Sequence, residues 1–139
     1  MKKAFPKRCR MGFTLIELLV AMTIVAILTS LALVSIEGAR KASRDGKRKT
    51  DLEQVRSALE MYRADIGSYP ANRGLLSPDY LDPLPTDPIS SSYSYYYERD
   101  ATNYSIYRLC ARLETGGGTD CSDRSCGTAG TCNYEVNNP

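Results

Sequence analysis

One acidic residue inside a long apolar run constrains this chain more than any other feature. Residues 13–36 carry no charge except that of Glu17. A membrane core of about 30 Å needs about 20 apolar residues in a helix, so this run is long enough to span it. A charge in such a helix costs roughly 2.5–3.5 kcal/mol and is rarely kept without a partner or a function. We therefore expect a partner to meet Glu17 inside the membrane.

The apolar side chains of the run outweigh the cost of this charge. Phe, Leu, Ile and Val fill more than half of its positions. At about 0.3–0.6 kcal/mol each near the helix centre, they favour insertion by roughly 4–8 kcal/mol in total. Glu17 also lies near the start of the run, where the helix dipole favours an anion. The sequence thus predicts a transmembrane helix over residues 13–36.

Residues 1–12 precede the run and carry basic side chains without any acid. The basic residues are Lys2, Lys3, Lys7, Arg8 and Arg10. This composition is typical of a targeting segment, but an ordinary signal peptide has a shorter apolar region that ends at a small-residue cleavage site. A lipoprotein signal is excluded because Cys9 precedes the apolar run. A plain signal anchor remains an alternative, although it leaves Glu17 unexplained.

The string Gly12-Phe13-Thr14-Leu15-Ile16-Glu17 resembles the prepilin cleavage and methylation signature of type IV pilins and type II secretion pseudopilins. The resemblance implies that residues 1–12 form a leader, which a prepilin peptidase removes by cutting between Gly12 and Phe13. The same enzyme would methylate the new amine of Phe13. Glu17 would become the fifth residue of the mature chain, the buried acid of the family.

The chemistry of this string accounts for such a role. The freed amine of Phe13 has a reference pKa near 8, so it is mostly cationic at neutral pH. It can pair with Glu17 of a neighbouring subunit, and leaving either charge alone in apolar surroundings costs several kcal/mol. A head-to-tail contact of this kind that does not close into a ring produces a filament. We therefore predict that Phe13 and Glu17 dock subunits together.

The resemblance also implies partners and a location. The partners are identical or related pilin subunits, the prepilin peptidase, an inner-membrane assembly platform and the membrane, with no small-molecule substrate. The chain would cross the cytoplasmic (inner) membrane once, with its leader in the cytoplasm and its C-terminal domain outside it. It would later lie in a periplasmic or cell-surface filament.

The helix is expected to continue beyond the membrane run, over residues 37–67. Apolar residues recur there at spacings of three and four, at Leu52, Val55, Leu59, Tyr62 and Ile66. This stripe predicts an amphipathic helix that packs on a small C-terminal domain, with a coiled-coil partner as the alternative. Gly67, with Pro70 just beyond it, predicts that the helix ends at about Ile66.

A basic stretch occupies the start of this second helical segment. Its members are Arg40, Lys41, Arg44, Lys47, Arg48 and Lys49. We interpret it as a solvated helix face, with anionic head groups or DNA phosphates as alternative contacts. Gly38 and Gly46 lie in the same stretch and each costs about 1 kcal/mol relative to Ala, so a bend or local melting is expected there.

The C-terminal region, residues 68–139, begins with a proline-rich loop and ends with four cysteines. The cysteines are Cys110, Cys121, Cys126 and Cys132. In a small exported domain they predict two disulfides, for which three pairings are possible. A zinc site is the alternative, although the spacing has no CxxC pair and the chain has no His.

Alternating residues predict the strands of this region. Residues 93–97 and 104–113 alternate in polarity around a turn at 99–103, and a third strand is expected near 133–136. We therefore expect an α+β fold. A long N-terminal α-helix, transmembrane in its first half and amphipathic in its second, packs on a small antiparallel β-sheet.

Two proline motifs extend the resemblance toward the major pseudopilin of type II secretion systems. They are Tyr69-Pro70 after the helix and the segment 84–88 before the first strand. Major pseudopilins often hold a calcium ion in a late loop, and here Asp120 and Asp123 can supply carboxylates. We expect no cofactor, with calcium as the alternative, because two disulfides can fix the same loop.

An enzyme is not supported by the residues, since the chain has no His for a triad or a general base. We predict a structural subunit of a type IV pilus-like filament, with a type II secretion pseudopilus favoured over other pili. The alternatives are a membrane-anchored extracytoplasmic binding module that does not polymerise, and a competence-type pilin that contacts DNA. Nucleic acid is not expected as a partner.

The processing signal gives the first testable prediction. Gly12→Val places a branched side chain at the predicted cleavage site and should leave the basic leader attached. The intact mass of the membrane-extracted protein measures this. If the wild-type chain still begins at Met1 or Lys2 in cells with an active prepilin peptidase, the predicted processing is wrong.

Overall fold

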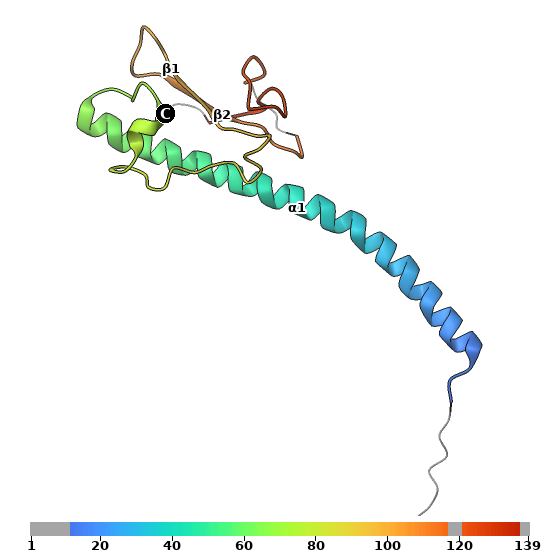
Figure 1. The fold of residues 1–139 in the computed structure, drawn as a ribbon. Helices are drawn as coiled ribbons and strands as arrows, with labels where there is room; N and C mark the ends of the chain where they lie inside the picture. Colours follow the sequence, from blue (N-terminus) through green and yellow to red (C-terminus); the bar gives the residue numbers. More distant parts are fainter. Residues whose placement is uncertain (1–11, 117–120, 137–139) are drawn as a thin grey trace, which may run out of the picture. The chain divides into compact units, whose positions relative to one another are not determined.

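The computed structural model describes residues 12–116 and 121–136 of the chain. Their contacts separate two compact units, residues 1–37 and 38–139. One helix, α1 (Leu15–Ile66), contributes to both units, and a short 3-10 helix, η1 (Arg73–Leu76), follows it. The second unit also holds a three-stranded antiparallel sheet (Figure 1). The predicted α+β architecture is confirmed.

The helix α1 ends where the sequence predicts. Gly67 follows its last residue with a φ of 85°, a conformation that glycine adopts at no steric cost. The Gly67 N–H donates to the carbonyl of Arg63 at 2.8 Å and so closes the last turn. The helix is continuous through Gly38 and Gly46, so of the two expected alternatives, a bend or local melting, the structure shows no melting at these glycines.

The predicted apolar stripe forms the core of the second unit. Leu52, Val55 and Leu59 are fully buried, and Tyr62 packs against them. The prediction that Ile66 belongs to the packed stripe is wrong, because its side chain is 58% exposed. The helix ends at this residue, and fully buried Tyr69 joins the core from beyond the turn instead.

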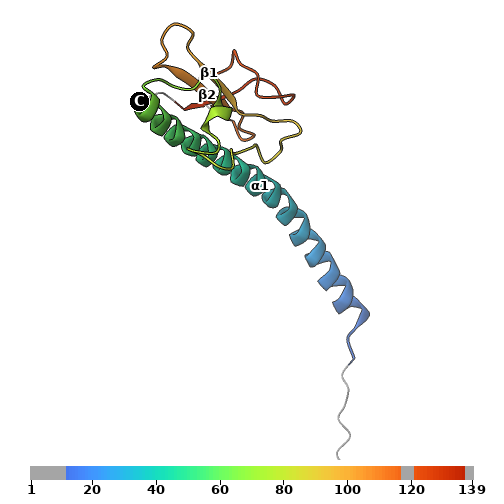
Figure 2. The same cartoon turned by 60° about the vertical axis from the view of Figure 1, so that its left-hand side comes forward.

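The sheet covers this stripe with alternate residues of its strands. Its members are β1 (Tyr96–Arg99), β2 (Tyr107–Ala111) and β3 (Tyr134–Val136), in the order β1-β2-β3. Tyr107, Leu109 and Ala111 belong to the core that contains the helix stripe, whereas Cys110 belongs to a second cluster. This division follows the two-residue period of a strand. Both views show β1 and β2 beside the C-terminal part of α1 (Figures 1 and 2).

The first strand begins later than the sequence predicts. The alternation predicts a strand over residues 93–97, but Tyr95 precedes β1 and is buried with its hydroxyl on Asp51 at 2.7 Å. Asp100 fixes the turn, because its carboxylate accepts from the backbone N–H groups of Thr102 and Asn103. The strand therefore runs on to Arg99. The second strand is shorter than the predicted 104–113, and the third lies within its predicted range.

The four cysteines form a second, smaller core together with Tyr96. They are joined as Cys110–Cys121 and Cys126–Cys132, which selects one of the three possible pairings. The first bond links β2 to the loop that follows residue 120. The second closes a shorter loop of the chain before β3. Because the sulfurs are bonded to each other, they do not supply the thiolates that zinc requires.

The disulfides give the second testable prediction. Replacing Cys110 and Cys121 together by Ala should lower the free energy of unfolding by about 2–5 kcal/mol, because the unfolded chain loses a cross-link. Urea unfolding of the detergent-solubilised full chain measures this, with Cys9→Ala in the leader as the control. Thiol labelling of the unreduced, denatured mature protein should find none of the four cysteines reactive. Four reactive thiols would contradict the disulfides.

Candidate functional site

The first turn of α1 is closed by a capping box between Thr14 and Glu17. The N–H of Glu17 donates to Thr14 Oγ1 at 3.3 Å, and the N–H of Thr14 donates to Glu17 Oε2 at 3.3 Å. The Thr14 hydroxyl also donates to Glu17 Oε2 at 3.2 Å. Such reciprocal bonds satisfy backbone donors that a helix start leaves unpaired. The Thr-x-x-Glu spacing is the sequence signal for this box, and it lies within the motif that predicts processing and docking.

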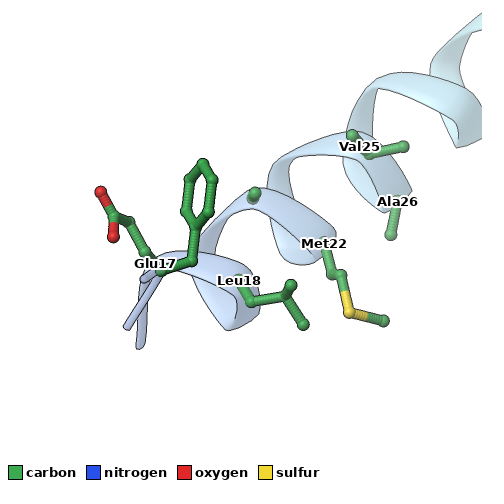
Figure 3. A pocket seen from close by; sticks show the side chains of 7 residues that line it. Glu17, Leu18, Met22, Val25 and Ala26 are labelled. Atoms are coloured by element: carbon green, nitrogen blue, oxygen red, sulfur yellow. The ribbon is translucent and has the colours of Figure 1, made fainter. Parts of the chain in front are cut away.

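The residues predicted to serve in processing and docking lie together at the start of the apolar helix. Gly12 and Phe13 immediately precede the box, and Glu17 is part of it. Figure 3 shows the carboxylate of Glu17 projecting from the start of the helix, away from Leu18 and Met22. The cap thus fixes where this carboxylate lies while leaving it at the surface of the chain.

The helix after the cap exposes apolar side chains around its circumference. Phe13 is 86% exposed, and the large apolar residues that follow it as far as Leu31 are exposed as well. One face forms a shallow groove, lined by Phe13, Glu17, Leu18, Ala21, Met22, Val25 and Ala26 (Figure 3). By length and composition, α1 is suited to cross a membrane. Lipid or other apolar helices are the environments that would cover such a surface.

A cluster of charged side chains surrounds Arg48 in the second half of α1, beside the core of the second unit. Arg48 is fully buried, although the sequence pattern places it on a solvated helix face. Its guanidinium donates two bonds to Asp87, at 2.7 and 2.9 Å. It also donates to Asp45 and to Glu114, each at 2.8 Å. The interpretation of Arg48 as solvated is therefore wrong, because three carboxylates compensate its buried charge.

The same cluster ties the loop after β2 to the helix. Arg44 donates to both carboxylate oxygens of Glu114, at 2.7 and 2.6 Å. Asp45 accepts from the backbone N–H groups of Glu114 and Thr115 and from the Thr115 hydroxyl. Burial raises the pKa of Asp45, whereas the hydrogen bonds from Thr115, Glu114 and Arg48 lower it. Together these bonds outweigh burial, so the pKa lies below its usual value.

The two candidate calcium ligands are Asp120 and Asp123. Asp120 lies outside the residues that the structure describes. Both carboxylate oxygens of Asp123 accept from Arg108, at 3.1 and 3.2 Å, and the pair holds the pKa of Asp123 below its usual value. Cys110, Cys121 and Glu135 also bring ligand-type atoms together, but these two sulfurs are joined in a disulfide.

Comparison with known families matches both parts of this arrangement. Residues 7–33 match the prokaryotic N-terminal methylation motif, and residues 35–124 match the type II secretion system protein G family. The chain belongs to the type II secretion system protein G family. This is a family of structural pseudopilins and pilins, not of enzymes, and the chain is a structural subunit of a pilus-like filament.

Two relatives named core protein G align with most of the chain, and a pilin aligns with about half of it. The chain is 29% identical over 126 residues to the type II secretion system core protein G of Vibrio cholerae, covering 79% of this chain and 86% of the relative. The corresponding protein of Pseudomonas aeruginosa is 27% identical over 134 residues, covering 84% and 94%. The type IV wide pilus major component PilA4 of Thermus thermophilus is 38% identical over 65 residues, covering 47% and 50%. No solved structure matches significantly.

The charged cluster around Arg48 gives the third testable prediction. We expect the protein to lose stability in acid. The pair with Arg44, followed by Arg48, lowers the pKa of Glu114 to about 2 from 4.5. Because the folded pKa lies below the unfolded one, this stabilisation is complete above about pH 5 and is lost as the pH falls toward 2. It amounts to about 3 kcal/mol at most.

Urea unfolding at a series of pH values measures this effect. Glu114→Gln should lower the free energy of unfolding at neutral pH and flatten its fall in acid. Glu53→Gln is the matched control, since Glu53 is exposed and paired only at the surface with Arg56. If Glu114→Gln and Glu53→Gln give the same acid profile as the wild type, the cluster does not produce the acid sensitivity.

Proposed function

We propose that this chain is a subunit of a type II secretion pseudopilus and that it assembles through its N-terminal helix. The observation that carries the proposal is the exposed apolar helix whose lone acid, Glu17, is fixed at the first turn. The relatives support the secretion system, since those that align with most of the chain are named core protein G. The shorter match to PilA4 supports a type IV pilus as the second candidate.

The docking contact joins the amine of Phe13 in one subunit to Glu17 in its neighbour. An exposed carboxylate at the start of an apolar helix needs a cation wherever that helix is buried. The amine freed at Phe13 is such a cation, and it arises beside the same exposed apolar surface. Pairing within one chain is the competing arrangement, because Phe13 directly precedes Thr14, whose N–H already contacts Glu17.

Processing of the leader, residues 1–12, precedes assembly. A Cβ added at Gly12 would meet no atom within 4 Å, so the described fold does not itself require glycine at this position. A requirement for glycine would then come from the prepilin peptidase, which we propose cuts after Gly12 and methylates Phe13. The inner-membrane assembly platform is the further proposed partner.

The chain crosses the cytoplasmic (inner) membrane once in this proposal, with its C-terminal domain outside the cytoplasm. The two disulfides support this placement, because such bonds form and persist in oxidising compartments. The filament that follows would lie in the periplasm or, for the pilus candidate, at the cell surface. We expect no bound cofactor, and a calcium ion at Asp120 and Asp123 is the alternative that the test in the next section addresses.

The rival functions draw less support from the geometry. A binding module that does not polymerise gives Glu17 no role beyond the cap. A DNA-contacting pilin would use the basic stretch, but the charges of Arg44 and Arg48 are engaged by carboxylates of their own chain. Nucleic acid is therefore not among the partners we propose.

The fourth testable prediction separates docking from capping. Glu17→Leu should insert and be processed but should enter filaments at least about tenfold less, because a lost buried pair costs several kcal/mol. Thr14→Ala is the matched control, because it removes the capping hydroxyl and keeps the carboxylate. It should assemble nearly as well as the wild type. The measurement is the fraction of processed protein in sheared or pelleted filaments.

Two results would contradict the docking role. If Glu17→Leu assembles as well as the wild type, the charge of Glu17 is not required for assembly. Equal assembly defects in Glu17→Leu and Thr14→Ala would show that the cap, and not the pairing of charges between subunits, is what assembly requires. Glu17→Asp should be intermediate, since it keeps the charge on a side chain one methylene shorter.

A further inference from the structure

The guanidinium of Arg48 lies where carboxylates from three separate segments converge. Asp45 comes from α1, Asp87 from the proline-rich loop and Glu114 from the loop after β2. All four of the hydrogen bonds that reach these acids from Arg48 are 2.7–2.9 Å long. Several carboxylates around one central cation is the arrangement by which proteins hold calcium. Here the central cation is a side chain of α1.

The donors of the protein occupy the oxygens of these carboxylates. Asp87 Oδ1 accepts from the N–H of Ile89 at 2.8 Å as well as from Arg48. Asp45 accepts from two backbone N–H groups and a hydroxyl of the loop after β2. Glu114 accepts on both oxygens from Arg44. A metal ion would have to displace these charge-assisted bonds, which are stronger than neutral ones.

Another carboxylate of the loop after β2, that of Asp123, is also paired with an arginine. Asp123 binds Arg108 with both of its oxygens. The same region is fixed covalently to β2 by the bond between Cys110 and Cys121. Asp45, Asp87, Glu114 and Asp123 therefore do not fit the calcium ion that the resemblance to major pseudopilins implies, because each of these four acids is already paired with a guanidinium group.

We propose that Arg48 is the built-in cation of this domain, and that the domain folds and fixes the loop after β2 without binding a divalent cation. Arg44 completes the arrangement by holding Glu114 from its other side. The proposal concerns the domain alone and does not depend on how the subunits assemble, so it can fail while the filament role stands.

The first arm of the test uses calcium on the wild-type protein. Full-length protein in detergent micelles is melted in excess EGTA and in a series of calcium concentrations up to the millimolar range. The proposal predicts the same Tm throughout and no calcium retained in equilibrium dialysis. A site present at 100 times its Kd would raise the Tm by more than about 10 °C. Such a rise, or stoichiometric retention of calcium, would overturn the proposal.

The second arm removes the built-in cation. Arg48→Met leaves three acids without their shared partner and should lower the Tm in EGTA by more than about 10 °C. Lys47→Met is the matched control, since Lys47 is the exposed neighbour of Arg48, and its Tm should stay within about 2 °C of the wild type. Equal Tm values for the two variants would contradict the role of Arg48.

A milder variant keeps this arm decisive if Arg48→Met does not fold. Arg48→Lys retains one positive charge but loses the planar fork that reaches several acids at once. Its Tm should lie below that of Lys47→Met. A Tm of Arg48→Lys equal to that of the wild type would show that the fork is not required, and would also overturn the proposal.

Discussion

One continuous helix has to serve two different environments, and the remaining features of this protein depend on that constraint. Its first part exposes apolar side chains and begins at a capped acid, Glu17. Its second part buries the stripe that includes Leu52 and Leu59, and it carries the buried charge of Arg48. A single helix, continuous from Leu15 to Ile66, thus presents the exposed apolar surface that we propose for assembly and also supports a folded domain.

Two of the charged residues on this helix, Glu17 and Arg48, are subject to the same physical rule. A charge removed from water must be compensated, or its burial costs several kcal/mol. Arg48 is compensated within its own chain by Asp45, Asp87 and Glu114. Glu17 is engaged by neutral donors of Thr14, which do not neutralise its charge. This difference is why we assign Arg48 a role in the fold and Glu17 a role in contacts between subunits.

Features encoded locally could be predicted from the sequence. The apolar run, the helix end at Gly67 and the third strand follow from periodicity and from the conformational freedom of glycine. The partners of Arg48 could not be found this way, because Asp87 and Glu114 lie 39 and 66 residues further along the chain. The residues of the N-terminal methylation motif identify it, whereas the capping role of Thr14 depends on the local backbone geometry. The strand β1 begins later than the sequence predicts for a tertiary reason, the hydrogen bond between Tyr95 and Asp51.

The central claim, that the amine of Phe13 pairs with Glu17 of another subunit, can be tested in the filament itself. Filaments assembled from equal amounts of two subunit populations, one with a ¹⁵N-labelled Phe13 amine and one with a ¹³C-labelled Glu17 carboxylate, would be studied by solid-state NMR. The account predicts a nitrogen–carbon contact at salt-bridge distance in these mixed filaments. A contact that appears only when both labels are in the same chain would contradict it.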